Sequence, residues 1–265
     1  MTLEILICTI DNGIHNIKNM LLTPISGVSY LISWQHSDNF IASDIPEELK
    51  RDDIKIVTIK GKGLSRNRNN ALSHATSDIC LIADDDCTYR PEYLSDVIST
   101  FNNDSTLDLA TFKMSNLYEQ KRYPSHSFNL KKFEKGYYVS SIEIAFRRTS
   151  IQGKLCFNEL FGLGAPVLQS GEENIFILDA IEAELNCQFF PITIVEHNHP
   201  TTSTSGASKP GVIMAEGAYI SRAYPFTSPI RLVLKAHRLN RVNHLGLFTN
   251  LSHLIKGITY YSNNK

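Results

Sequence analysis

An apolar run that ends in three consecutive carboxylates constrains the fold of this chain more than any other feature. Residues 79–83 are apolar, and Asp84, Asp85 and Asp86 follow them directly. A short apolar run bounded by turn residues is typical of a parallel strand that is buried on both faces. Ligands of open α/β sheets bind beyond the carboxyl ends of such strands, so the three acids lie where a ligand is expected.

Two interpretations of these acids are open. Adjacent carboxylates repel one another and are most easily kept together by a cation, and oxygen ligands suit Mg²⁺, Mn²⁺ or Ca²⁺. Asp-rich segments also form ordinary turns and helix N-caps, and Pro91 and Glu92 soon afterwards indicate the start of a helix. The strand alone does not separate a metal site from a turn.

The composition is that of a globular protein with one large core or a core domain with an appendage. Of the 265 residues, 42% are hydrophobic and 20% are charged. The 26 basic and 27 acidic side chains nearly balance, so no general affinity for polyanions is expected and nucleic acid is not a predicted partner. Five scattered cysteines predict neither a disulfide framework nor a structural zinc site. The amino-terminal residues lack the pattern of a secretory signal and no long apolar stretch follows, so we expect an intracellular protein.

Strand and helix patterns alternate along most of the chain. Apolar runs predict strands at residues 3–10, 28–34, 54–59, 79–83, 109–114, 139–146 and 189–195. Helical periodicity predicts helices at 14–22, 64–75, 94–101, 172–185, 212–224 and 230–239. Residues 157–171 and 201–211 have loop compositions, and 118–138 show no interpretable period. Alternation of this kind predicts a mostly parallel sheet flanked by helices.

Several motifs occur in a fixed order. They are a glycine followed by an Arg-Asn helix at 63–72, an Asp-x-Asp pattern at 84–86 with a proline-led helix at 91–94, a glycine-rich loop at 157–165, a pair of acids heading a helix at 171–176, and histidines at a strand end at 195–199. Together they resemble the inverting family 2 glycosyltransferases of the GT-A fold, of the type that assembles bacterial surface polysaccharides. The resemblance covers about residues 3–206.

The resemblance implies an α/β fold of the GT-A type. Its centre would be a mostly parallel, Rossmann-like sheet flanked by helices. The GT-A domain would cover residues 1–205, with a nucleotide-binding half at about 1–115 and an acceptor half at about 116–205. Residues 206–265 would form a C-terminal helical extension.

The resemblance also implies a divalent cation, Mn²⁺ or Mg²⁺, that bridges the two phosphates of the donor. Asp86 matches the position that binds the metal, and Asp84 the position that reaches the ribose or a metal-bound water. Asp85 is expected to point the other way by strand alternation. His197 and His199 alternate onto one face of the last strand, so either could complete the coordination. A histidine that only caps the strand end by hydrogen bonds is the alternative for each.

A set of side chains and backbone groups is expected around the bound nucleotide sugar. An arginine near the start of a helix can add a charge-assisted bond to a pyrophosphate, although a solvated or structural role is the alternative. Many relatives have an aspartate that binds uracil after the second strand. The corresponding residue here is Gln35, whose side-chain amide can still hydrogen-bond a pyrimidine. UDP is therefore the first expectation for the nucleotide, with the base left open. The expected donor-binding residues are Thr9, Asp11, Gln35, Lys62, Arg66, Arg68, Asp84 and Asp85.

An inverting transfer needs one carboxylate to take the proton of the acceptor hydroxyl. Glu173 matches this general-base position, where relatives usually have aspartate. Glu172 is the second candidate, because the longer side chains move the carboxylates by a methylene. Acids at a helix N-terminus are also favoured by the helix dipole alone.

The sequence therefore predicts a metal-dependent inverting glycosyltransferase in surface polysaccharide or capsule biosynthesis. The sugar would move from a nucleotide sugar to a saccharide or a lipid-linked saccharide. A non-catalytic sugar-nucleotide-binding or scaffold protein is one alternative, and a sugar nucleotidyltransferase is another, although its Gly-rich basic loop is missing after the first strand. The basic and apolar C-terminal residues suit a peripheral contact at the inner face of the cytoplasmic membrane, a homodimer interface, or a helical cap with its basic face in water.

Overall fold

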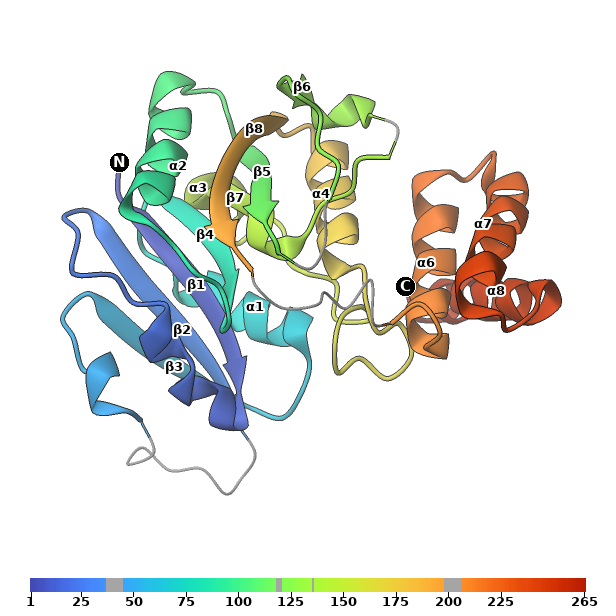
Figure 1. Ribbon diagram of the computed structural model, residues 1–265, viewed down its shortest axis with the longest axis horizontal. Helices are drawn as coiled ribbons and strands as arrows, with labels where there is room; N and C mark the ends of the chain where they lie inside the picture. Colours follow the sequence, from blue (N-terminus) through green and yellow to red (C-terminus); the bar gives the residue numbers. More distant parts are fainter. Residues whose placement is uncertain (37–44, 118–120, 135, 198–205) are drawn as a thin grey trace. The chain divides into compact units, whose positions relative to one another are not determined.

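The computed structural model describes residues 1–36, 45–117, 121–134, 136–197 and 206–265, and these form two compact units (Figure 1). The first, which we call the sheet unit, contains residues 1–62, 66–156 and 179–199. The second, the helical unit, contains residues 63–65, 157–178 and 200–265. Each unit is described by itself.

The sheet unit is built on one eight-stranded sheet with the strand order β3-β2-β1-β4-β7-β5-β8-β6. Parallel pairs join β1 to β2 and β4, β2 to β3, and β5 to β8, whereas β7 runs antiparallel to β4 and β5, and β6 runs antiparallel to β8. The predicted mostly parallel sheet is confirmed. The strands are β1 (Leu3–Ile10), β2 (Val28–His36), β3 (Ile54–Lys60), β4 (Ile79–Asp84), β5 (Leu109–Ser115), β6 (Phe128–Asn129), β7 (Ile144–Arg147) and β8 (Cys187–Glu196).

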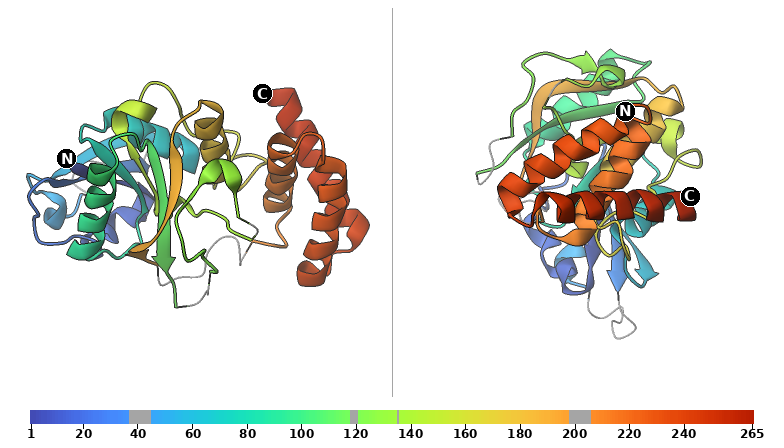
Figure 2. Two further views of the ribbon diagram at one scale, coloured as in Figure 1. Left: turned by 90° about the horizontal axis from the view of Figure 1, so that it is seen from above. Right: turned by 90° about the vertical axis from the view of Figure 1, so that its right-hand side faces the viewer.

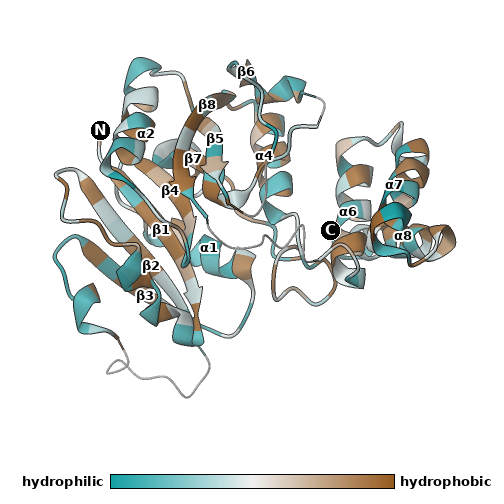
Figure 3. Ribbon diagram, viewed as in Figure 1, coloured by the Kyte–Doolittle hydropathy of each residue, from teal (hydrophilic) through white to brown (hydrophobic). Residues whose placement is uncertain are grey.

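Helices cover both faces of this sheet, and α1 (Leu64–His74) and α2 (Pro91–Asn103) lie on opposite faces (Figure 2). On the α2 face, the alternate β1 residues Leu3, Ile5 and Ile7 are fully buried and belong to the same apolar cluster as Leu94 and Phe101 of α2. Hydrophobic residues also lie along β1, β4 and β8 in the hydropathy view (Figure 3). Short helices complete the unit, namely η1 (Asp11–His15), η2 (Ile17–Asn19), η4 (Glu47–Leu49), η5 (Leu130–Lys132), η6 (Ser141–Glu143) and α3 (Arg148–Ile151), while α4 (Glu172–Glu182) spans the division between the units.

Two predicted elements of the sheet unit differ from the structure. The helix predicted at residues 14–22 is wrong, because this segment forms the 3₁₀ helices η1 and η2 while still burying Ile14 and Ile17. The strand predicted at 139–146 is limited to β7, because a capping box between Ser140 and Glu143 fixes η6 in front of it.

The helical unit contains three long helices, α6 (Pro210–Ala223), α7 (Ser228–Asn243) and α8 (Leu247–Asn264), and α8 crosses the other two (Figure 2). A Cβ atom at Gly217 of α6 would collide with the backbone of Leu254, and a Cβ atom at Gly257 of α8 would collide with the backbone of Met214. The two glycines therefore allow α6 and α8 to approach closely. The sequence predicted α6 and α7 but missed α8. Among the described residues, no helix combines the length and apolar character needed to cross a bilayer.

Candidate active site

The three consecutive carboxylates each contact a different partner at the carboxyl end of β4. Asp84 Oδ1 accepts a hydrogen bond from Arg68 Nη2 at 3.0 Å. Asp85 accepts a hydrogen bond from the hydroxyl of Thr9, at the end of the neighbouring strand β1. Asp86 Oδ2 lies 3.2 Å from Nε2 of His197. The side chains of Asp84 and Asp86 are each 35% exposed, so both carboxylates can reach a ligand from solvent.

His197 is held beside Asp86 by backbone pairing. Thr88 and Glu196 form an isolated antiparallel bridge with N···O distances of 2.8 and 2.9 Å, which brings the chain after Asp86 to the end of β8. The backbone N–H of His197 also donates to the carbonyl of Ser115 at 2.9 Å. The buried imidazole is therefore fixed in place next to the carboxylate. His199, the second predicted histidine, lies outside the described residues.

The two side chains that meet here, Asp86 and His197, suit a hard divalent cation. Asp86 and His197 offer one carboxylate and one imidazole, and Mg²⁺ and similar ions are commonly bound by one or two carboxylates together with substrate phosphates. The described part of the chain contains no group of three or more His, Cys, Asp or Glu side chains that could hold a metal ion by itself. The residues present thus fit a cation that the donor phosphates help to bind.

Asp85 is packed differently from its neighbours. Burial raises the pKa of its carboxyl group, the Thr9 hydroxyl opposes that shift, and the charges of Asp86 and Asp84 add to it. Gly13 lies against the same pair, since a Cβ atom there would collide with Asp85 Oδ2 and the Thr9 hydroxyl oxygen. Nothing in the sequence pattern indicated this contact of Gly13.

The predicted phosphate-binding basic residues fall into two groups. Arg68 is completely buried, and its Nη2 donates to Asp84 and, at 2.8 Å, to the hydroxyl of Ser141. Arg66 and Lys62 are exposed, and the Arg66 guanidinium lies near Gly61. The structure therefore places Arg68 under the carboxylates and leaves Arg66 and Lys62 accessible to a ligand.

An amide and hydroxyl network holds the ends of β1 and β2 against α1. Asn67 Nδ2 donates to the carbonyl of Thr9 at 3.0 Å, and Asn67 Oδ1 accepts from the hydroxyl of Ser33 at 2.6 Å. Asn70 Nδ2 donates to the same hydroxyl at 2.8 Å. The sequence pattern did not indicate these partners of Ser33, Asn67 and Asn70. The only available signal was the excess of asparagines in a predicted helix, where this residue is unfavourable without a specific partner.

The residues predicted to contact the nucleoside lie at the ends of β1 and β2. Gln35 is buried in β2, where it pairs in register with Ile10 of β1. Asp11 follows β1 with a φ of 48°, in the left-handed region, and its carbonyl accepts a hydrogen bond of 3.0 Å from Trp34 Nε1. The Trp34 indole thus fixes the backbone at the point where the strand ends.

The two predicted base residues open α4 in the helical unit. Glu172 is buried, and its carboxylate lies beside Gly162, where a Cβ atom would be 3.2 Å from Oε2. Glu173 is half-buried and accepts a hydrogen bond of 2.6 Å from the amide of Asn174. Burial raises the pKa of Tyr219 on α6, and the negative charge of Glu173 adds to this effect. Glu173 therefore lies near Tyr219, a neighbour that the sequence pattern did not indicate.

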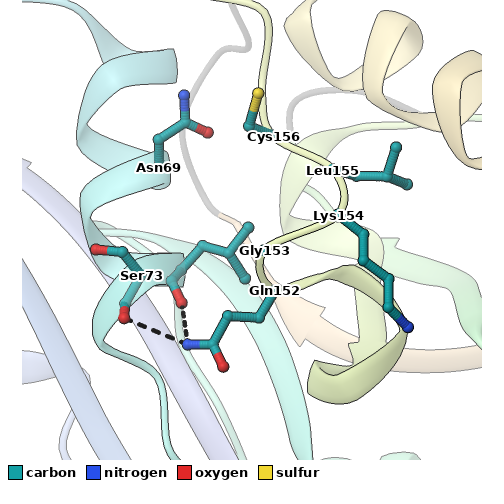
Figure 4. A pocket seen from close by; sticks show the side chains of 8 residues that line it. Asn69, Ser73, Gln152, Gly153, Lys154, Leu155 and Cys156 are labelled. Carbon is teal, nitrogen blue, oxygen red and sulfur yellow. Dashed lines mark hydrogen bonds between the residues drawn. The ribbon is translucent and has the colours of Figure 1, made fainter.

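A surface pocket of the sheet unit lies apart from these carboxylates (Figure 4). It is formed by the later turns of α1 and by the segment that follows α3, where Gln152 Nε2 donates to the carbonyls of Leu72 and Ser73 at 2.8 and 3.3 Å. None of the predicted site residues lines it. We therefore place the candidate site at the carboxyl ends of β1, β4 and β8 and not in this pocket.

Comparison with known families supplies the decisive observation. Residues 37–158 match the family described as Glycosyl transferase family 2, and this segment includes Arg68 and the three carboxylates. This segment, nearly half of the chain, is that of a family 2 glycosyltransferase. No curated protein matches the glycosyltransferase in sequence.

Solved structures resemble the glycosyltransferase over most of its length. Residues 1–349 of Staphylococcus aureus TarS share 14% identity, with 100% of this chain and 92% of that chain covered and a TM-score of 0.60. The same fragment in complex with UDP gives 12% identity, the same coverage and a TM-score of 0.57. Its complex with UDP-GlcNAc gives 14% identity and a TM-score of 0.56, with 93% of this chain and 74% of that chain covered. At these identities the likeness shows the fold alone, and it confirms the predicted GT-A type.

Proposed function

We propose that this glycosyltransferase is a metal-dependent inverting enzyme that moves a sugar from a UDP-sugar to a saccharide or a lipid-linked saccharide. The contact of 3.2 Å between Asp86 and His197, at the carboxyl ends of two strands, is the observation that carries the proposal. It joins residues that are more than a hundred positions apart in the chain. Two such groups are suited to hold one hard cation beside a diphosphate.

In this proposal the carboxylates divide their roles. Asp86 and His197 hold the cation, which when bound offsets the charge that develops on the leaving diphosphate. Asp84 is held by Arg68, remains partly exposed, and is the proposed contact for the ribose of the donor. Asp85 supports the site through Thr9, so it positions β1 against β4 rather than contacting the diphosphate.

The nucleotide would lie across the ends of β1 and β2. Asp11 and Gln35 are the proposed contacts for the nucleoside, and the exposed Arg66 and Lys62 the proposed contacts for the phosphates. The TarS structures in complex with UDP and UDP-GlcNAc support a UDP-linked donor as the first choice. We accordingly propose that residues 1–115 form the nucleotide-binding half and 116–205 the acceptor half of the GT-A domain.

Glu173 is the proposed general base, with Glu172 as the second candidate. The base takes the proton of the acceptor hydroxyl, whose oxygen attacks the anomeric carbon while the bond to the diphosphate breaks on the opposite face. Glu173 suits this role better than Glu172, because it is less buried and its carboxylate is reached by the amide of Asn174. Glu172 is buried beside Gly162, which indicates a role in shaping the loop.

We further propose that the enzyme acts in surface polysaccharide assembly, at the inner face of the cytoplasmic membrane. A lipid-linked acceptor would be presented there, and the basic C-terminal helices suit either that membrane or a second copy of the chain. Residues 206–265 are the proposed helical extension.

The proposal is tested by assaying a panel of nucleotide sugars for hydrolysis in the presence of Mn²⁺ and of EDTA. We expect UDP-sugars to be hydrolysed only with the metal. Glu173→Gln should lower acceptor transfer by at least about a hundredfold, whereas Glu172→Gln should change it much less. Hydrolysis that is unaffected by EDTA, or equal activity of the two variants, would contradict the proposed roles.

A further inference from the structure

The outward side of α7 carries apolar side chains between basic ones. Its inward side packs Leu232, Ala236 and Leu239 into the helical unit. On the opposite side Ile230 is 68% exposed and Leu234 is 54% exposed. We use the name α7 outer face for these two residues together with Phe226 in the preceding turn and the exposed Arg238 and Arg241.

The spacing places these residues on one stripe of the helix. Positions 230, 234, 238 and 241 recur at intervals of three or four residues, which aligns them along one side of an α-helix. Phe226 lies just before the helix and is 97% exposed. Large apolar side chains this exposed are costly in water unless a partner covers them.

The charged side chains of residues 206–265 are mostly basic. Residues 206–265 contain eight Lys or Arg side chains and one acidic residue, Glu216, although the whole chain has a net charge of -1. Glu216 forms an ion pair with Lys235 inside the helical unit, so its charge is already matched. The α7 outer face is therefore apolar and cationic together.

We infer that the α7 outer face docks this protein on an anionic lipid bilayer. A bilayer accepts apolar side chains at the boundary of its acyl chains while its headgroups attract lysine and arginine. A second copy of the chain is a poorer partner, because a two-fold contact brings the same patch to itself and would oppose Arg238 and Arg241 with like charges. The inference deepens the proposed function, on which it rests for the lipid-linked acceptor, by naming the surface that meets the membrane.

Vesicle flotation of the full chain tests this inference. The vesicles are phosphatidylcholine alone, or phosphatidylcholine with about one third phosphatidylglycerol, which gives an anionic surface. We expect flotation only with the anionic vesicles and its loss at high salt. The double variant Arg238→Gln with Arg241→Gln should bind about 30-fold more weakly, from about 1 kcal/mol per removed cation. Ile230→Ser with Leu234→Ser should also lose binding at unchanged charge.

A matched control removes two exposed cations from the sheet unit, Lys131→Gln with Lys132→Gln, and should float like the wild type. Equal flotation with neutral vesicles, or anionic binding unchanged in both α7 variants, would overturn the inference. Dimers in light scattering with no flotation would overturn it in favour of a second copy. Donor hydrolysis measured without vesicles reports on the proposed function separately, and the arginine variants should retain it.

Discussion

Asp84, Asp85 and Asp86 are neighbours in the sequence, yet Arg68, Thr9 and His197 separate their environments. Asp84 contacts the guanidinium of Arg68, Asp85 contacts the hydroxyl of Thr9 at the end of β1, and Asp86 contacts the imidazole of His197. These separate partners reduce the charge repulsion between the three adjacent carboxylates. The chemistry that we propose depends on this separation, because the partly exposed Asp84 and Asp86 can reach a ligand while the carboxylate of Asp85 is held by the hydroxyl of Thr9.

Arg68 provides the first prediction at the residue scale. Arg68→Met removes the buried partner of Asp84 and Ser141, so it should lower the free energy of unfolding by about 2 kcal/mol, less than for a fully buried pair because Asp84 is partly exposed. Urea unfolding measures this change. The exposed Arg66→Met should stay within about 0.5 kcal/mol of the wild type while weakening UDP binding. A stable Arg68→Met variant with reduced UDP affinity would instead support a direct phosphate contact.

The sequence predicted which side chains gather at this site better than it predicted what each one contacts. The resemblance to family 2 glycosyltransferases implied that Asp86 and one of the two histidines lie together, and the side chains of Asp86 and His197 do meet. The burial of Arg68 was not predictable, because it depends on η6 bringing Ser141 to the same guanidinium nitrogen that binds Asp84. Side-chain partners of this kind are fixed by packing and not by spacing.

At the scale of the element, the structure confirms the helix that was predicted at α1, but it shows contacts of the α1 asparagines that the sequence did not predict. The helix runs from Leu64 to His74, close to the predicted range. Its asparagines belong to the motif that resembles family 2 glycosyltransferases, and in the structure Asn67 and Asn70 bind Ser33 and the end of β1. The helix thus holds two strand ends in place for the nucleotide.

Asn67 offers a test of this role. Asn67→Leu leaves the carbonyl of Thr9 and the hydroxyl of Ser33 without this buried partner, and should lower the free energy of unfolding by about 1–3 kcal/mol. Chemical denaturation gives the value. The same change at Asn102, exposed on α2, is the control and should have little effect. Equal stability of both variants would show that the amide network does not hold α1 to the sheet.

The segment after β1 shows why local pattern was insufficient at the element scale. Residues 14–22 have helical spacing of apolar side chains, and Ile14 and Ile17 are indeed buried. Gly13 must lie against Thr9 and Asp85, and Asp11 takes a positive φ. These tertiary contacts favour two short 3₁₀ helices over one α-helix, and no local propensity reports them.

At the scale of the whole molecule, the chain combines a sheet unit that carries the carboxylates with a helical unit that carries the proposed base. The sheet was predictable from the alternation of strands and helices. The helical unit was only partly predictable, because α8 is amphipathic over a sequence rich in Gly, Ser, Thr and Asn, which weakens the helical signal. Its formation is explained by packing on α6.

The crossing of α6 and α8 gives a prediction about the integrity of the helical unit. Alanine normally stabilises a helix relative to glycine by about 0.5–1 kcal/mol. Gly257→Ala should nevertheless lower the melting temperature, because the added methyl group collides with the backbone of Met214. Ser252→Ala, at an exposed position of α8, should leave it unchanged or raise it slightly. A more stable Gly257→Ala protein would show that the two helices do not pack this closely.

The central claim is that the carboxylates after β4 hold the donor diphosphate through a divalent cation. Calorimetric titration of UDP into the wild type and into Asp86→Ala, each with Mn²⁺ and with EDTA, tests it most directly, with Asp96→Ala on the exposed side of α2 as the control. We predict that the wild type and Asp96→Ala bind UDP at least about tenfold more tightly with Mn²⁺ than with EDTA, and that Asp86→Ala loses this difference while keeping its fold by circular dichroism. Equal affinity of the wild type with Mn²⁺ and with EDTA, or a metal dependence that survives in Asp86→Ala, would contradict the account.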